Sequence, residues 1–425
     1  MSIFFYAVTI IQIIEICYSY KKTKRIISIP NVFFVGVSIN FILYLCNWSS
    51  LFIVKCLPVT YMVIGGCTLV VVIFDLIYLK KNKNIVNSEP ISLDLSIMRL
   101  RFGSIRIHFS TVVFLICFSC AAIENFMMYH TLFPFLYNID SHKYSSAVFG
   151  TLWKALYPVG FFSFYFEQKR VVKKKIVSYI ILLLTSIYLL IGGGSRFWTF
   201  VTILSFVFFY FINVRKNIKL KTVIFVVLVG TQILRVFLLM GMTRLQSAYT
   251  YMELIGYNGP FKNTIFSNAM SWFYGYFPYS FYNLNLTLQN IQNNGICTYG
   301  QFFMLPFLYL TKLYKLTSLD YSELALSVRV ISNTSATVAT AFFEFYSDFK
   351  YFFFLPMVFY CFCMYQFQSK NTLFSQGAYA YCLACLFLFS FYNVFSPGIP
   401  YTFILLWYLF NKLLIRKCPM QNSVT

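Results

Sequence analysis

Residues 57–79 read LPVTYMVIGGCTLVVVIFDLIYL, an apolar run of helical length with one charged residue, Asp75. A helix needs about 20 apolar residues to cross a hydrocarbon core of about 30 Å, because its backbone polar groups must bond to one another there. Similar runs recur along the 425-residue chain, which is 59% hydrophobic and 11% charged, with a mean hydropathy of +0.71. This composition excludes an ordinary soluble domain and predicts an all-α, polytopic integral membrane protein.

The runs predict about eleven transmembrane helices, within a range of about ten to twelve, in one integral membrane domain over residues 1–425. One interruption, Met242–Asp348, is too polar and too broken to cross a bilayer. We expect it to form a long loop, partly helical, between transmembrane helices. The expected spans are 2–20, 31–46, 57–79, 107–127, 147–167, 176–191, 197–212, 222–241, 349–368, 378–395 and 400–415.

The basic residues predict the orientation of these helices. Most of the 34 Lys and Arg residues fall in alternate connections, among them 21–25, 80–106 and 168–175. Such residues are retained on the cytoplasmic side, so the segment Met242–Asp348 is expected outside the cytoplasm, which is the periplasm if the membrane is a bacterial inner membrane. The net charge of +22 is therefore mainly a topology signal that also suits anionic lipid, and no folded basic face for nucleic acid is evident.

Cofactor chemistry has little support in the sequence. Most of the twelve cysteines lie within apolar runs, where Cys behaves as a small hydrophobic residue, and no His cluster accompanies them. No Gly-rich nucleotide loop follows a predicted strand, and the widest cytoplasmic connection, Lys80–Arg106, is too short for a nucleotide-binding domain. We expect no metal and no cofactor, so the energy for any reaction must come with the substrate or from a gradient.

Four arginines are candidates for binding a diphosphate. Arg196 ends the tract Gly192-Gly-Gly-Ser-Arg196, where glycines free backbone N–H groups to face an anion and Arg adds a bidentate donor. Arg235 lies near the outer end of an apolar span, Arg244 begins the long segment, and Arg329 lies further along it. A tight turn with an interfacial Arg, or snorkelling to lipid headgroups, explains the same residues without a ligand.

The long segment also holds carboxylates and aromatic rings. Glu253, Glu344 and Asp348 are carboxylates that would accept a proton from an attacking hydroxyl if burial raised their pKa. Aromatic rings with polar tips suit the faces of sugars and equally suit a membrane interface. We favour the interface for most of them and a sugar platform for a few, namely Tyr257, Trp272 and Tyr276.

Charged residues inside the predicted spans form a separate group. Such residues usually pair across helices or line a route through the membrane. Spacing alone does not assign the pairs. The group consists of Glu15, Asp75, Glu124 and Lys154.

The chain resembles a known family in its overall organisation. The features are its size, GGGSR opening one helix, one long external loop in the C-terminal half, and the tract Asn333-Thr-Ser … Phe345-Tyr-Ser-Asp348-Phe before a late helix. In these it is similar to the bacterial O-antigen polymerases, the Wzy oligosaccharide repeat-unit polymerases. The resemblance covers most of the chain in architecture, whereas its residue signatures are short.

The resemblance implies a GT-C-like architecture and a glycosyl transfer on the periplasmic face of the inner membrane. A growing glycan on undecaprenyl diphosphate would be moved to the terminal sugar of another lipid-linked repeat unit, in a pathway of O-antigen, lipopolysaccharide or other surface polysaccharide. A chain-length regulator protein is a further partner implied. Arg196 matches the family's Gly-Ser-Arg tract best. Members often carry a Gly about eleven positions after an Arg, but Arg244 is followed by Gly256 and Gly259 instead.

Our hypothesis is that Arg196, Arg235, Arg244 and Arg329 surround a diphosphate and that Glu253 or Glu344 is the general base. Two alternatives stay open. A lipid-linked oligosaccharide flippase, which is a transporter, would use the charged residues within the spans, although it is expected to have short connections and two similar halves. An O-antigen ligase would share the chemistry but use lipid A-core as its acceptor.

Overall fold

The computed structural model describes thirteen stretches of the chain, and every structural statement below concerns these residues. They are 1–23, 25–81, 99–102, 105–134, 148–168, 176–191, 196–213, 251–264, 266–311, 313, 321–332, 339–370 and 372–416. The chain forms two compact units. Unit 1 comprises Met1–Ser88, Val214–Gln366 and Cys385–Pro397, and unit 2 comprises Glu89–Asn213, Phe367–Ala384 and Gly398–Thr425.

The described part of the chain is predominantly helical and contains helices that suit a membrane. Four are long and apolar enough to cross one, and a fifth would be added if a helix pair bent by 110° is counted as a single span. The prediction of a helical membrane protein is confirmed at this level, and the expected span 222–241 lies outside the described residues. The four helices are Ser2–Thr23, Pro58–Lys81, Phe109–Tyr129 and Leu373–Ser390.

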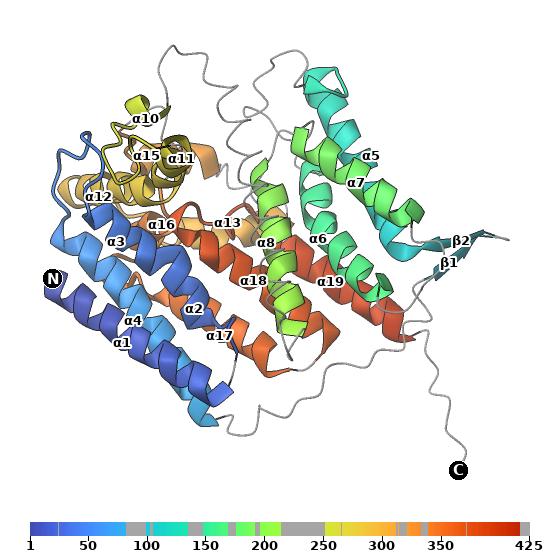
Figure 1. Ribbon diagram of the computed structural model, residues 1–425, viewed down its shortest axis with the longest axis horizontal. Coiled ribbons are helices and arrows are strands. Elements are labelled where there is room, and N and C mark those ends of the chain that lie inside the picture. Colours follow the sequence, from blue (N-terminus) through green and yellow to red (C-terminus); the bar gives the residue numbers. More distant parts are fainter. Residues whose placement is uncertain are drawn as a thin grey trace. The chain divides into compact units, whose positions relative to one another are not determined.

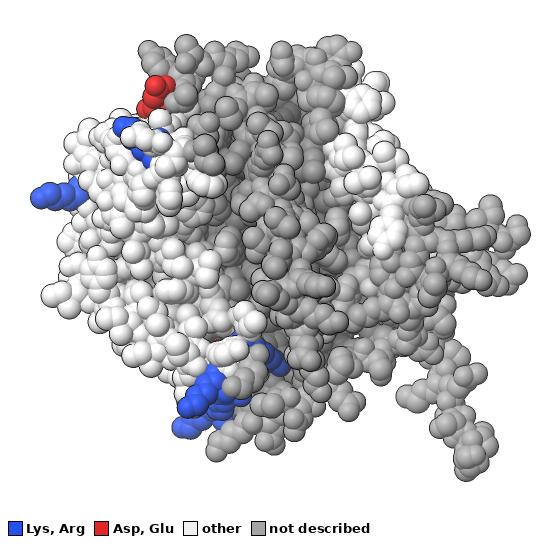
Figure 2. Space-filling view, viewed as in Figure 1, with Lys and Arg blue, Asp and Glu red and all other residues white. Residues whose placement is uncertain are grey.

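In unit 1, helices α1 (Ser2–Thr23) and α4 (Pro58–Lys81) lie side by side and run in the same direction (Figure 1). Their basic ends meet, because the Nζ atom of Lys22 donates to the carbonyl oxygen of Leu79 at 2.7 Å. Cations at a helix C-terminus also favour the helix dipole. In Figure 2 Lys and Arg gather over these two ends, where the last turns carry Lys21, Lys22, Lys80 and Lys81.

The expected span 31–46 is a continuous helical run of three parts in unit 1, α2 (Ile29–Phe33), a π-helical turn η1 (Phe34–Ser38) and α3 (Ile39–Leu45). The run begins at Ser28, whose hydroxyl accepts from the N–H group of Asn31. Gly36 is required where the run crosses the chain near Phe387, because a Cβ atom there would lie 2.4 Å from the carbonyl oxygen of Phe387.

The long segment folds into short helices within unit 1. They are α10 (Tyr251–Leu254), α11 (Ser267–Tyr276), α12 (Pro278–Asn293), α13 (Gln301–Thr311), α15 (Tyr321–Val328) and α16 (Phe342–Phe349). Asn285 of α12 fixes this group against the start of α4, because its Oδ1 atom accepts from Leu57 N at 2.8 Å and from Thr60 Oγ1 at 2.7 Å. A helix of 24 residues is about 36 Å long. The long segment therefore lies at the end of α4 opposite to its basic end.

The expected span 349–368 is not one straight helix. Helix α16 ends at Phe349, a 3-10 turn η4 (Lys350–Phe352) follows, and α17 (Leu355–Ser369) leaves at an angle of 110°. Lys350 closes α16 with a φ of +48°, a left-handed conformation that a helix cannot continue. The sequence around the break stays aromatic and apolar, so hydropathy does not reveal it. Asp348, expected at the end of the loop, lies inside buried α16.

The described residues of unit 2 form a group of helices and a hairpin. The helices are α5 (Phe109–Tyr129), α6 (Phe149–Gln168), α7 (Ile176–Ile191), α8 (Arg196–Asn213) and α19 (Ile399–Arg416). The first part of α18 (Leu373–Phe387) belongs to this unit as well. Within unit 2, Trp407 donates from Nε1 to the carbonyl oxygen of Phe374 at 3.1 Å. Gly377 leaves room for that indole, since a Cβ atom would lie 2.3 Å from Nε1.

One element departs from the predicted all-α class. Strands β1 (Arg99–Phe102) and β2 (Ile105–His108) form an antiparallel hairpin with Arg99 opposite His108. It lies in the expected cytoplasmic connection and leads directly into α5. The expected span 107–127 therefore begins two residues before the helix does, because Ile107 and His108 pair with β1 and α5 begins at Phe109.

Candidate functional site

Glu344 is the buried carboxylate around which the candidate site is built. It lies on α16, is 1% exposed, and its Oε2 atom accepts from Asn393 Nδ2 at 2.6 Å and from Ser396 Oγ at 2.5 Å. The first residue before the helix is also fixed, because Ala341 N donates to the carbonyl oxygen of Phe389 at 2.9 Å. Two donors on one oxygen set the direction of the carboxylate.

The two donors come from a non-helical segment that follows η5 (Leu388–Ser390). The side chain of Asn393 also accepts from the N–H group of Phe395 at 3.2 Å, the local turn that Asn favours. The expected span 378–395 is thus shifted, since the helix begins at Leu373 and regular structure ends at Ser390. Irregular backbone at membrane depth is tolerated where protein covers it, and both Asn393 and Ser396 are buried.

Asp348, one turn after Glu344, caps another helix. Its Oδ1 atom accepts from Thr298 Oγ1 at 2.5 Å and from Phe302 N at 3.2 Å, and its Oδ2 atom accepts from Phe303 N at 2.8 Å. These amides belong to the first turn of α13, whose N–H groups have no partner within the helix. Asp348 therefore acts as an N-terminal cap from a distant part of the chain, and we assign it an architectural role.

A row of buried and half-buried polar side chains on α12 holds the segment that contains Arg329. Asn283 Oδ1 accepts from Ser332 N at 3.2 Å, and Thr287 Oγ1 accepts from Val330 N at 3.0 Å. Asn290 Nδ2 donates to the carbonyl oxygen of Val328 at 3.1 Å. Arg329 is half-buried in this segment, and its Nε atom has no hydrogen-bond partner among the residues that the structure describes. These hydrogen bonds therefore hold the backbone that carries the guanidinium group of Arg329.

Part of the predicted diphosphate site lies outside the described residues. Arg235 and Arg244 fall there, as does the tract Gly192–Ser195. Arg196 is the first residue of α8, which places its backbone at a helix N-terminus, and its side chain is not described. The encirclement of a diphosphate by these four arginines stays a prediction.

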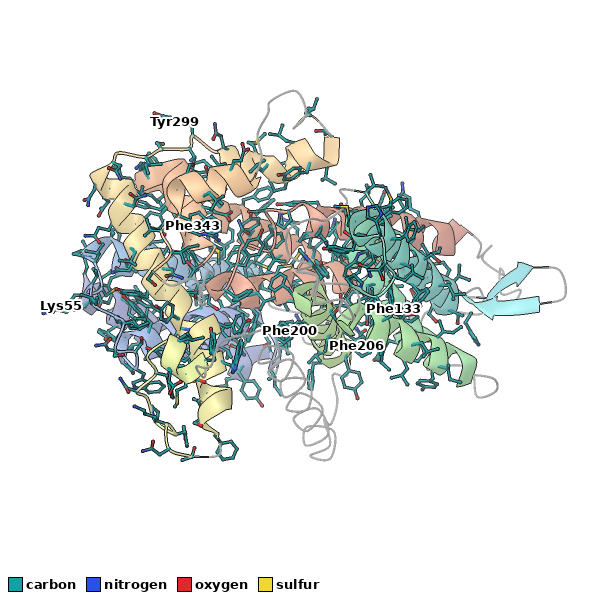
Figure 3. All side chains as sticks on the ribbon, turned by 90° about the horizontal axis from the view of Figure 1, so that it is seen from above. Lys55, Phe133, Phe200, Phe206, Tyr299 and Phe343 are labelled. Carbon is teal, nitrogen blue, oxygen red and sulfur yellow. The ribbon has the colours of Figure 1, made fainter. Side chains whose placement is uncertain are left out.

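The two predicted bases differ in surroundings. Glu253 is exposed on the four-residue helix α10, whereas Glu344 is buried. Phe343, beside Glu344, points into the interior in Figure 3, while Lys55 and Tyr299 of the same unit project outward. Glu344 is consequently the member of the pair whose environment restricts water and fixes orientation, as general-base catalysis requires.

The predicted sugar-binding rings pack mainly on one another. Tyr251 stacks on Trp272 with centroids 3.8 Å apart and an interplanar angle of 8°, and Trp272 stacks on Tyr276 at 5.6 Å. Gly275 permits this stack, since a Cβ atom there would lie 2.4 Å from Tyr251 Oη. Trp272 is only 5% exposed, so the stack as it stands presents little of that ring to a sugar. Tyr276 is half-buried, and the centroid of its ring lies 5.5 Å from that of Phe391, in the segment that carries Asn393.

Tyr257 is more deeply buried than Trp272, since only 1% of it is exposed. Its hydroxyl donates to the carbonyl oxygen of Pro260 at 2.6 Å, and burial raises its pKa. It is therefore neutral at physiological pH and acts as a hydrogen-bond donor that closes its own loop. We interpret Tyr257 as a structural residue of the segment.

Comparison of the chain with protein-family models, curated proteins and solved structures finds no match. The candidate site therefore depends on its own geometry. Asn393 and Ser396 were not among the residues predicted from the sequence. The available signal was the polar tract Asn393-Val-Phe-Ser396-Pro-Gly, which interrupts an otherwise apolar C-terminal region.

Proposed function

We propose that this chain is a membrane glycosyltransferase that polymerises a lipid-linked oligosaccharide, with Glu344 as its general base. The observation that carries the proposal is the buried, doubly hydrogen-bonded carboxylate of Glu344 at a broken helix. Ionisable residues and broken helices inside membrane proteins usually mark substrate sites. The resemblance to the O-antigen polymerases supports the choice of substrate, undecaprenyl diphosphate carrying a glycan.

In the proposed reaction, Glu344 takes the proton from a hydroxyl of the acceptor sugar. The oxygen then forms a bond to the anomeric carbon of the donor while the bond from that carbon to the diphosphate breaks. The diphosphate leaves with the electron pair and remains on the undecaprenyl lipid. Because the diphosphate is already a good leaving group, the protein supplies a base and cations, and we assign the cations to Arg196, Arg235, Arg244 and Arg329.

Ser396 donates a hydroxyl group to Glu344, as an acceptor sugar would. Its hydroxyl lies 2.5 Å from Glu344 Oε2, which is the distance expected of a hydroxyl bonded to a carboxylate. We propose that the acceptor hydroxyl replaces Ser396 Oγ when substrate binds, while Asn393 keeps the carboxylate oriented. The aromatic series from Trp272 through Tyr276 to Phe391 leads toward this point.

The proposal includes the sidedness of the site. Unit 1 has its basic helix ends at one end of α4 and the long segment at the other. Basic ends are retained in the cytoplasm, so we place the long segment and the active face in the periplasm of a bacterial inner membrane. About eleven spans and a GT-C-like architecture complete the proposed topology.

Complementation of a deletion strain tests this function. The strain receives the wild-type chain, Glu344→Gln or Glu253→Gln, and its glycolipids are separated on a gel beside an immunoblot of the protein. We expect Glu344→Gln to leave one repeat unit on lipid A-core and Glu253→Gln to keep the full ladder. A full ladder from Glu344→Gln at wild-type protein level would remove Glu344 from the reaction.

Transport of the lipid-linked oligosaccharide is the second candidate, and one observation favours it. Glu15 and Asp75 are buried carboxylates on α1 and α4, both of which are candidate spans. The same deletion strain separates the possibilities. Repeat units trapped on the cytoplasmic face indicate a lost flippase, and core without any repeat unit indicates a lost ligase.

A further inference from the structure

Glu15 and Asp75 meet inside the candidate membrane spans of unit 1. Glu15 lies on α1 and is 3% exposed, while Asp75 lies on α4 and is 2% exposed. Helices α1 and α4 pack against each other, and the side chain of Glu15 interacts with that of Asp75. At 1.5 Å per residue, Glu15 is about 12 Å from the basic end of α1 and Asp75 about 9 Å from that of α4. The pair is thus enclosed by the helices, nearer to their basic ends.

The pair is short of hydrogen-bond donors. Tyr365 of α17 donates its hydroxyl to Asp75 Oδ1 at 2.7 Å. Both oxygens of Glu15 and Oδ2 of Asp75 have no partner among the described residues. Gln12, one turn before Glu15, has other partners, because its amide nitrogen donates to the carbonyl oxygen of Pro30 and its oxygen accepts from Ser38. Ionised carboxylates only accept hydrogen bonds, so apart from the Tyr365 hydroxyl no described residue supplies a donor to the two groups.

Among the residues that the structure describes, the titratable groups around the pair offer no compensating charge. Cys361 and Tyr365 face Asp75 from α17, and Tyr78 of α4 packs on Tyr365 with centroids 4.8 Å apart. Residues Ile29–Phe33 of α2, which packs on both helices, include no titratable side chain. The cations of α1 lie in its last turn, at Lys21 and Lys22, and Lys22, two turns after Glu15, donates to the carbonyl oxygen of Leu79. Two adjacent carboxylates in such surroundings cannot both be ionised without a large free-energy cost.

We propose that Glu15 and Asp75 form a proton-binding site within the membrane-spanning part of unit 1. One proton lies on Glu15 and is donated to Asp75 Oδ2, which supplies the missing donor, while Tyr365 satisfies the other oxygen of Asp75. A metal ion fits less well, since no group of three or more His, Cys, Asp or Glu residues is found in the described part of the chain. The site exchanges its proton with the side of the membrane where the basic ends lie.

Release of the proton would place two negative charges between α1 and α4. The packing of these helices is then linked to proton occupancy, independently of whether the chain is a glycosyltransferase. Unfolding separates the two carboxylates into water, where they release the shared proton near neutral pH. The folded state therefore binds more protons than the unfolded state, and its stability falls as the pH rises.

Infrared spectroscopy of the purified, full-length protein in detergent tests the site directly. At neutral pH the wild type is expected to show the C=O stretch of a protonated carboxyl group, shifted on transfer to D2O. Glu15→Gln and Asp75→Asn should each remove that absorption, because the remaining carboxylate is ionised and accepts from the new amide. Glu124→Gln, a substitution at a buried carboxylate of unit 2, is the matched control and should leave it.

Thermal unfolding provides a second, independent measurement. The wild-type Tm should fall between about pH 5 and about pH 8, and that of Glu15→Gln should change much less. Tyr365→Phe should keep the absorption and shift it, since Asp75 loses its other donor. An absorption that neither Glu15→Gln nor Asp75→Asn removes would overturn the proposal. An absorption that Na⁺ abolishes at constant pH, when choline does not, would replace the proton by a sodium ion.

Discussion

Glu344 and Asp348 lie one turn apart on the same buried helix, yet their carboxylates have different kinds of partner. Asp348 accepts from two backbone N–H groups of α13 and from Thr298. Glu344 accepts from the side chains of Asn393 and Ser396. Backbone donors at a helix start cannot move without opening that helix, whereas side-chain donors can rotate away when a substrate arrives. The difference indicates which carboxylate maintains the fold and which is suited to chemistry.

The comparison also explains why burial alone does not identify a functional carboxylate. Both residues are at least nine-tenths buried, and both carboxylates accept hydrogen bonds. Their difference lies in what would be lost on substitution. Removing Asp348 leaves amide groups of α13 without an acceptor, while neutralising Glu344 leaves two side chains that can find other partners.

The largest effect on stability is expected from Asp348→Ala. It leaves two amide N–H groups and the hydroxyl of Thr298 without an acceptor in a buried place, at a cost of about 2–4 kcal/mol. Asp348→Asn keeps one carbonyl acceptor and should cost about half as much. The measurement is Tm in detergent, with the glycan ladder normalised to the amount of folded protein. A normalised ladder that disappears in Asp348→Asn at unchanged Tm would contradict the architectural role.

A smaller effect on stability, combined with a loss of activity, is expected from Asn393→Asp. The donor that faces Glu344 Oε2 at 2.6 Å becomes a second acceptor, so two carboxylates would compete for one proton. We expect a destabilisation of about 1–2 kcal/mol at neutral pH and a ladder weakened at least about 10-fold. The introduced pair holds a proton when folded, so stability should recover as the pH falls. Asn393→Gln is the control, because it retains an amide donor, and equal behaviour of the two variants would contradict the proposed contact.

The sequence predicts helices well where an apolar run ends in charged residues. The ranges 57–79 and 176–191 correspond closely to α4 and α7. Lys80 and Lys81 follow the first apolar run, and Lys173–Lys175 precede the second. It predicts poorly where a helix breaks inside an apolar stretch. Lys350, with its positive φ, interrupts a helical run between aromatic residues, where hydropathy does not reveal the break.

The polar residues of the long segment predict burial less well than the apolar residues of the spans predict helices. Asn283 and Asn285 of α12 suggest a solvated surface when read alone, yet both are buried and satisfied by partners far away in sequence. The same reasoning applies to the candidate bases, since nothing in the sequence distinguishes Glu253 from Glu344. Only tertiary contacts decide which polar groups face water, because the partners of Glu344 lie 49 and 52 residues further along the chain.

The smallest effect is expected from Ser396→Ala. If the acceptor hydroxyl replaces Ser396 Oγ during the reaction, the methyl variant loses only a hydrogen bond of the substrate-free state, and the ladder should stay within about 3-fold of wild type. Ser396→Thr and Ser396→Ala are compared in the same strain, with densitometry of the ladder and an immunoblot as readouts. Thr keeps the hydroxyl but adds a methyl group to a buried position and should be the weaker of the two. An inactive Ser396→Ala variant at wild-type protein level would instead make the Ser396 hydroxyl a required partner of Glu344.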